Sequence, residues 1–159
     1  MFDFCNGSKL NNSIFKVKLM KKYSKATIEK FTAHVQEKAE GYNYLLENHH
    51  LELLATLDAI RGDKNAFNYL MRSRQVELAA FVNAIWDDQS AFRFLMDNKM
   101  FITAAMANII NGDEKAIEFL NKLNAHHYIH LALSIQQRIR EDNDRNSNIF
   151  SMMNIFKKS

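Results

Sequence analysis

The sequence predicts an all-α protein, a short α-solenoid of four 25-residue helix-pair repeats with capping helices. The chain has 159 residues with no proline and only four glycines, so few residues interrupt helices. Apolar residues recur with helical spacing along most of its length. The stretches IRGDKNAFNYLM, IWDDQSAFRFLM and INGDEKAIEFLN also follow one another at steps of 25 residues. A fixed period of this length is typical of stacked repeats.

The N-terminal residues 1–25 form a basic arm. Seven lysines lie within residues 1–30, against only Asp3 and Glu29, whereas the remaining residues carry 14 basic and 16 acidic side chains. Dense lysines can contact phosphates or an anionic membrane surface. Nucleic-acid or membrane binding through this arm is therefore the alternative function, with these candidate anion-binding residues: Lys16, Lys18, Lys21, Lys22 and Lys25.

Residues 26–140 form the predicted helical repeat domain, which begins with a cap at 26–40. Residues 27–36 align with the second helix of a repeat, but Glu29 and Thr32 stand where the first repeat has Leu54 and Leu57. One apolar face and one polar face are what a capping helix needs.

The repeats are 41–65, 66–90, 91–115 and 116–140, and four columns agree among them. One column is small, one is aromatic and two are identical: Gly41, Ala66, Ala91, Ala116; Tyr44, Tyr69, Phe94, Phe119; Leu45, Leu70, Leu95, Leu120; Ile60, Ile85, Ile110, Ile135. Helices of about ten residues are marginal alone, so each pair needs neighbours to cover its apolar face. The small column would let adjacent helices approach closely.

Short stops separate one repeat from the next. They read Gly62-Asp63, Asp87-Asp88 and Gly112-Asp113. A glycine after a helix adopts the left-handed conformation, and the following aspartate caps the next helix, which contributes about 1 kcal/mol. Aspartate tolerates the left-handed conformation better than most residues, so Asp87 fits the same role.

The C-terminal end departs from the repeat. The last repeat shows an apparent one-residue slip near 124–126, and a charged linker at 140–145 then leads into the tail, 141–159. Ile149, Met152, Met153 and Phe156 have the spacing of a helical stripe. We expect this tail helix either to fold back on the last repeat or to dock on a partner, with folding back favoured.

The spacing LENHHLELLATL at 46–57 resembles the helix junction of ankyrin repeats, and residues 72–78 echo it more weakly. The threonine–proline–leucine–histidine start of ankyrin repeats is missing, and a 25-residue unit leaves no room for their hairpin. The resemblance implies a related stack of helix pairs that binds proteins on a side surface without catalysis.

Motifs that would indicate an enzyme are missing from the sequence. Cys5 is the only cysteine, and no phosphate-binding loop or serine elbow occurs. His126 and His130 are four residues apart, but further ligands with metal-site spacing are lacking, so we expect no metal and no cofactor. The tripeptide Arg61-Gly62-Asp63 spells an adhesion motif but coincides with a helix stop.

The sequence therefore favours a non-enzymatic protein-interaction module whose partner is another protein. In repeat stacks, columns that vary between units present the binding surface. The candidate protein-binding residues in such columns, with a patch expected around the tryptophan and the two arginines, are Trp86, Arg72, Arg74, His49, His50 and Lys99. The chain shows neither a secretory signal nor a membrane-spanning run, from which we expect a cytoplasmic location.

Overall fold

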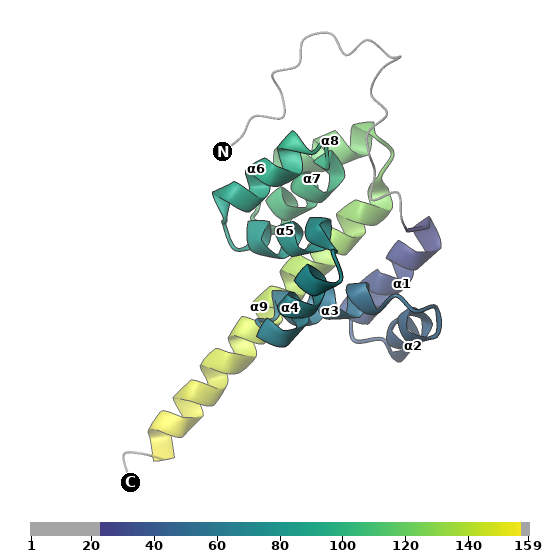
Figure 1. The fold of residues 1–159 in the computed structure, drawn as a ribbon. Helices are drawn as coiled ribbons and strands as arrows, with labels where there is room; N and C mark the ends of the chain where they lie inside the picture. Colours follow the sequence, from purple (N-terminus) through teal and green to yellow (C-terminus); the bar gives the residue numbers. More distant parts are fainter. Residues whose placement is uncertain (1–22, 157–159) are drawn as a thin grey trace, which may run out of the picture.

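The computed structural model describes residues 23–156, with side chains described as far as residue 146. This part of the chain is helical and contains nine helices, shown in Figure 1. They are α1 (Lys25–Val35), α2 (Ala39–Glu47), α3 (Leu51–Ile60), α4 (Lys64–Arg72), α5 (Val76–Ile85), α6 (Gln89–Asp97), α7 (Phe101–Ile110), α8 (Glu114–Lys122) and α9 (His126–Phe156). The all-α fold predicted from the repeats is confirmed.

The helices form two rows. The inner row is α1, α3, α5, α7 and α9, in which each helix contacts the next. The outer row is α2, α4, α6 and α8, and each outer helix contacts the inner helices before and after it. The second helix of each repeat begins at residue 51, 76, 101 or 126, so the period is 25 throughout. The slip expected near 124–126 was therefore wrong.

The stops between repeats have the predicted geometry. Gly62, Asp87 and Gly112 have φ angles of 95°, 63° and 93°, in the left-handed region. The aspartate after each stop accepts hydrogen bonds from backbone N–H groups of the helix that it caps. Each repeat therefore ends and restarts within two residues.

A second set of left-handed residues lies after α1 and after each outer helix, and sequence reasoning missed it. Glu37, His49, Arg74, Lys99 and Asn124 have φ angles between 53° and 60°, although none is glycine. In each case the backbone N–H of the following residue donates a hydrogen bond to a carbonyl oxygen of the preceding helix, at 2.8 to 2.9 Å. In the four repeats that carbonyl belongs to the identical leucine column, whose side chains are 0% exposed. The leucine thus fixes both the turn and the core.

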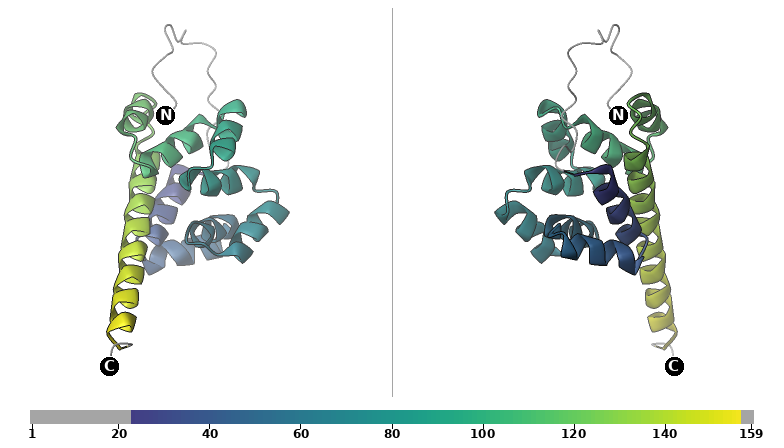
Figure 2. Two further views of the ribbon diagram at one scale, coloured as in Figure 1. Left: turned by 90° about the vertical axis from the view of Figure 1, so that its left-hand side faces the viewer. Right: turned by 90° about the vertical axis from the view of Figure 1, so that its right-hand side faces the viewer.

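The inner row closes on itself, which an open stack does not predict. Helix α1 lies beside α9 as well as beside α3, so the first and last inner helices meet (Figure 2). Apolar side chains from all five inner helices fill the space that they enclose. The predicted cap therefore contacts both ends of the stack.

Helix α9 is continuous from residue 126 to residue 156. The charged linker predicted at 140–145 is helical, and the tail does not fold back as favoured; it runs on past the other described helices (Figure 1). No helix in the described range is both long enough and apolar enough to cross a membrane.

At Gly41, in the small column, helix α2 comes very close to the backbone of α1. A Cβ atom there would lie 2.6 Å from the carbonyl oxygen of Lys30 and 2.8 Å from the carbonyl carbon of Ala33, and against the backbone nitrogen of His34. These are backbone atoms, which cannot swing away. The close approach expected from the small column is confirmed at this position.

We expect Gly41→Ala to destabilise the protein, by about 1–3 kcal/mol from overpacking. The gain in helix propensity, about 1 kcal/mol, offsets only part of that loss. Urea unfolding followed by circular dichroism measures the change in the free energy of unfolding. The control is Asn43→Ala, at an exposed position on the same helix. Equal stability of the two variants would show that α1 can move away from α2.

Candidate protein-binding groove

A groove lies where the turns after α3 and α5 face helix α9. Its volume is about 500 Å³. Its walls come from helix ends and turns on one side and from α9 on the other, with these lining residues: Ile60, Arg61, Gly62, Trp86, Ile139, Asp142, Asn143, Arg145 and Asn146. A second hollow of about 230 Å³ shares Trp86 and Ile139 with it.

Trp86 stands between these two hollows. It is the C-cap residue of α5 and its side chain is 55% exposed, the largest fraction among the exposed large apolar residues of the described chain. The corresponding residues of the neighbouring repeats are held by polar contacts within the chain. Arg61 pairs with Asp142, and the Asn111 side chain donates to Asp87 at 3.2 Å and to the carbonyl of Ala84 at 3.3 Å. Trp86 is thus the aromatic side chain that this surface presents.

Helix α9 is held in place at α7 by a side-chain cap. The Gln136 amide donates to the carbonyl oxygens of Ile109 and Ile110, both at 3.0 Å. These carbonyls end α7, and such groups need partners when a helix stops. The wall of the groove therefore has a defined position relative to the repeats.

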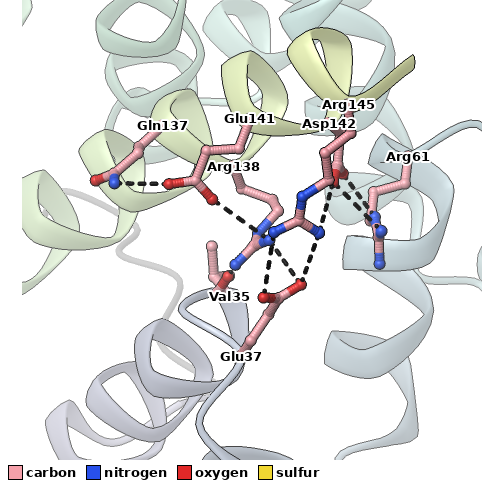
Figure 3. A network of polar contacts seen from close by, with 8 residues as sticks. All are labelled: Val35, Glu37, Arg61, Gln137, Arg138, Glu141, Asp142 and Arg145. Carbon is pink, nitrogen blue, oxygen red and sulfur yellow. Dashed lines mark hydrogen bonds and ion pairs between the residues drawn. The ribbon is translucent and has the colours of Figure 1, made fainter. Parts of the chain in front are cut away.

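A polar network fixes α9 at the end of the groove (Figure 3). Arg138 is 5% exposed, and its Nε donates to the carbonyl oxygen of Val35 at 3.0 Å. Its guanidinium also forms ion pairs with Glu37 at 2.7 Å and Glu141 at 3.4 Å. A buried arginine needs such partners because an isolated charge is costly away from water. Arg138 thereby joins α9 to the end of α1.

The network continues into the groove wall. Arg145 contacts Glu37 at 3.4 Å and Asp142 at 4.0 Å, and Asp142 accepts from the Nε of Arg61 at 2.7 Å. The hydrogen bond from Arg145, together with the charge of Arg138, holds the pKa of Glu37 below its usual value. The rim of the groove is therefore built from charged side chains that are already paired with one another.

The predicted binding residues do not form one patch. Arg74 precedes α5 and Trp86 follows it, and ten helical residues separate their ends by about 15 Å. His49, Arg74 and Lys99 are exposed at successive turns along the edge opposite Trp86, with Arg72 beside Arg74. The patch expected around Trp86, Arg72 and Arg74 is therefore not assembled, because the two arginines and the tryptophan lie at opposite ends of α5.

His50 belongs to a partly buried polar cluster. The Tyr23 hydroxyl donates to Glu52 Oε1 at 2.9 Å, and His50 Nδ1 lies 3.7 Å from the same oxygen. The His50 and Tyr23 rings meet edge to face, with centroids 5.7 Å apart. Burial, and next the charge of Glu52, raises the pKa of Tyr23 well above its usual value. His50 therefore packs within the stack near the start of α1.

The other sequence candidates give no second site. Lys25 pairs with Glu29 at 3.7 Å, while Lys16, Lys18, Lys21 and Lys22 lie outside the described residues. His126 contacts Asn121 at 3.1 Å. Among the side chains that the structure describes, no three His, Cys, Asp or Glu are grouped as metal ligands would be. The alternative function of the basic arm stays a prediction.

Sequence reasoning missed the α9 wall, Glu37 and Arg138. One signal was present, since Arg138 follows Ile135 by three residues and so occupies a core position of the α9 pattern. Its partner Glu37 is 101 residues away, and no local pattern links the two. Comparison with known proteins adds no relative: no family model, no curated protein and no solved structure matches this chain.

Arg138→Ala should lower the free energy of unfolding by about 2–4 kcal/mol, because the variant loses a buried hydrogen-bonded ion pair. Arg145→Ala, which removes an exposed contact to the same Glu37, should change stability little. Chemical unfolding of both variants measures the difference. Comparable effects would show that burial of Arg138 is unimportant for ring closure.

Stability should also depend on pH through Glu37. Its pKa is lowered in the folded protein, so the stabilisation is complete above the normal glutamate pKa of 4.5 and is lost as the pH falls below that value. Glu37→Gln should flatten the pH dependence of the melting temperature between pH 5 and pH 3, relative to the wild type. Glu118→Gln, on outer helix α8, is the control and should keep the wild-type slope.

Proposed function

We propose that this protein is a non-enzymatic interaction module that binds a segment of another protein molecule in the groove along α9. The observation that supports this most is the exposed Trp86, which lines both the groove and the hollow next to it. Binding energy at protein interfaces is concentrated in a few residues, and tryptophan is among the most enriched of them.

The rigidity of its surroundings supports the same proposal. Trp86 follows α5, which is packed on both sides in the inner row, and the opposite wall is fixed by Gln136 and Arg138. A preformed surface loses little entropy on binding. Ile139, which is partly exposed on α9, adds apolar surface beside the tryptophan, and the paired charges of the rim line the same groove. An apolar centre with a polar rim is the usual anatomy of a protein interface.

The rim charges favour a protein segment over a small charged ligand. Arg61, Asp142 and Arg145 pair with groups of the chain itself, as described above. A site for a charged small molecule needs polar groups that converge on the ligand. The groove instead offers apolar area around one aromatic anchor, which fits the apolar side chains of a peptide or helix.

Site-specific cross-linking tests the proposal. Replacing Trp86 with a photoreactive benzoylphenylalanine in the full chain should capture a defined protein segment in cell extract and in purified protein. The matched control places the same group at Tyr69, which is 41% exposed on outer helix α4. Identical products from both positions, or none from position 86, would contradict the proposed groove.

Affinity gives a second measure of the same prediction. Trp86→Ala should weaken binding of the captured segment about 30-fold, the equivalent of a hot-spot loss of about 2 kcal/mol. Because the side chain is half-exposed, we expect the variant to keep the wild-type circular dichroism spectrum.

A further inference from the structure

The turns that lead from each outer helix to the next inner helix form an edge of the stack. We call it the turn edge and define it as residues 46–51, 71–76, 96–101 and 121–126. Trp86 and its two hollows lie at the opposite ends of the inner helices, about 15 Å away along α5. The turn edge is therefore a surface separate from the groove, and the proposed function does not use it.

Apolar side chains protrude from the turn edge. Leu46 and Leu51 flank the first turn and are 45% and 43% exposed, while Met71 and Val76 flank the second turn and are 50% and 45% exposed. Leu123 in the fourth turn is 38% exposed. These five are half of the ten large apolar side chains that are exposed in the described chain, although the turn edge is a small part of it. Exposed apolar side chains gathered in this way indicate an interaction surface.

The turn edge is positively charged, in contrast to the opposite edge. With histidine neutral, its four basic residues outnumber Glu47 and Asp97, which leaves a net charge of +2. The matching segments at the ends of α1, α3, α5 and α7 carry six acidic and three basic residues, a net charge of −3. Those segments are 34–39, 59–64, 84–89 and 109–114, and the basic residues of the turn edge are Arg72, Arg74, Lys99 and Lys122.

The basic side chains of the turn edge are available to an external anion. All four are exposed, and within the described part of the chain none of them forms an ion pair. Arg61 and Arg145 at the groove, by contrast, pair with carboxylates of the chain itself. A negatively charged partner therefore meets unpaired cations at the turn edge.

We propose that the turn edge docks on the surface of an anionic membrane. Leu46, Leu51, Met71 and Val76 enter the interfacial layer, and the arginines and lysines contact the lipid phosphate and carboxylate groups. Proteins that lie on a membrane combine apolar and basic side chains in this way. The long stems of arginine and lysine pack along apolar surface while their charged ends stay at the headgroups. This second binding surface goes beyond the groove and does not depend on it.

The shape of the turn edge favours a membrane over an acidic protein segment. Segments of other proteins bind in concave sites, such as the groove beside Trp86. At the turn edge the apolar side chains come from successive turns and alternate with basic ones along the row. Packed helices lie about 8–10 Å apart, so three turns extend over about 20 Å. A membrane interface offers anionic and apolar groups side by side over the whole of that distance.

The described chain also begins at the turn edge. The Tyr23 hydroxyl donates to Glu52 near the start of α3, and the Tyr23 ring meets that of His50 in the first turn. The sequence before Tyr23 contains five lysines against one acidic residue, Asp3. The lysine-rich arm is thus joined to the folded part at the edge that carries the exposed apolar and basic side chains.

Binding of the full-length protein to vesicles tests the proposal. We expect sedimentation with vesicles of phosphatidylcholine containing about one third phosphatidylserine, and at least about tenfold weaker binding to pure phosphatidylcholine. The double variant Met71→Gln, Val76→Thr should bind the anionic vesicles about tenfold more weakly, because less apolar surface enters the interface. Leu133→Gln, at an apolar position of α9 that is 41% exposed, is the control and should bind like the wild type.

Charge variants separate the turn edge from the lysine-rich arm, which all of them retain. Arg74→Glu combined with Lys99→Glu should weaken binding at least about 25-fold, since each cation near an anionic surface contributes about fivefold. The control combines Lys64→Glu and Arg93→Glu, exposed positions of α4 and α6 that undergo the same change in charge. Equal losses in both double variants, or no loss in either, would assign binding to net charge or to the arm and overturn the proposal.

Tryptophan quenching by lipids with brominated acyl chains tests the orientation. Trp86 is the only tryptophan of the chain and lies at the edge opposite the turns. Its fluorescence should stay unchanged when the wild type binds anionic vesicles. In the variant Trp86→Phe, Val76→Trp, the fluorescence should be quenched. Quenching at position 86 without quenching at position 76 would overturn docking through the turn edge.

Soluble polyanions distinguish a membrane from other acidic partners. Polyglutamate and duplex DNA should compete weakly at equal charge, because they offer no apolar layer. If either binds as tightly as the vesicles, and the Met71→Gln, Val76→Thr variant binds it like the wild type, the turn edge is a general polyanion surface and the membrane proposal is overturned. Cross-linking from position 86 is measured without vesicles, so the proposed function stands or fails independently.

Discussion

The contact between the first and last inner helices, α1 and α9, is the constraint on which the rest of the structure depends. It turns a row of helix pairs into a closed ring with an apolar interior. Arg138 lies within this contact, bonded to the end of α1 through Val35 and Glu37. Because a buried guanidinium is tolerated only with its partners in place, the network permits a narrow range of positions for α9.

Ring closure also creates the surface on which function is proposed. The groove exists because α9 crosses opposite the turns that follow α3 and α5, and its rim charges belong to the closing network. Trp86 would be an isolated exposed side chain in an open stack. With α9 opposite, it lines a hollow whose walls are held by the closing network, so fold stability and the proposed binding surface depend on the same residues.

The turns show how one period accommodates two kinds of helix end. Between repeats, Gly62 and Gly112 take the left-handed conformation at little cost, and the aspartate that follows caps the next helix. Within repeats, long polar residues such as Arg74 and Lys99 take it instead, supported by a bond to the carbonyl of a buried leucine. The residues of this variable column therefore occupy exposed turn positions, at the end of the repeats opposite Trp86.

The sequence by itself determined the helices, their 25-residue pairing, the stops and the inward face, because each rests on contacts within a few residues of the chain or on the repeat. It also indicated Trp86 as an exposed aromatic residue. Only the tertiary structure decided that α1 meets α9, that Arg138 pairs with Glu37 and that α9 forms the groove wall. The first two pairings join residues about 100 positions apart and the groove wall joins residues more than 50 apart, and their geometry follows from the small rotation between successive repeats, added up around the ring. No local sequence pattern specifies this total rotation.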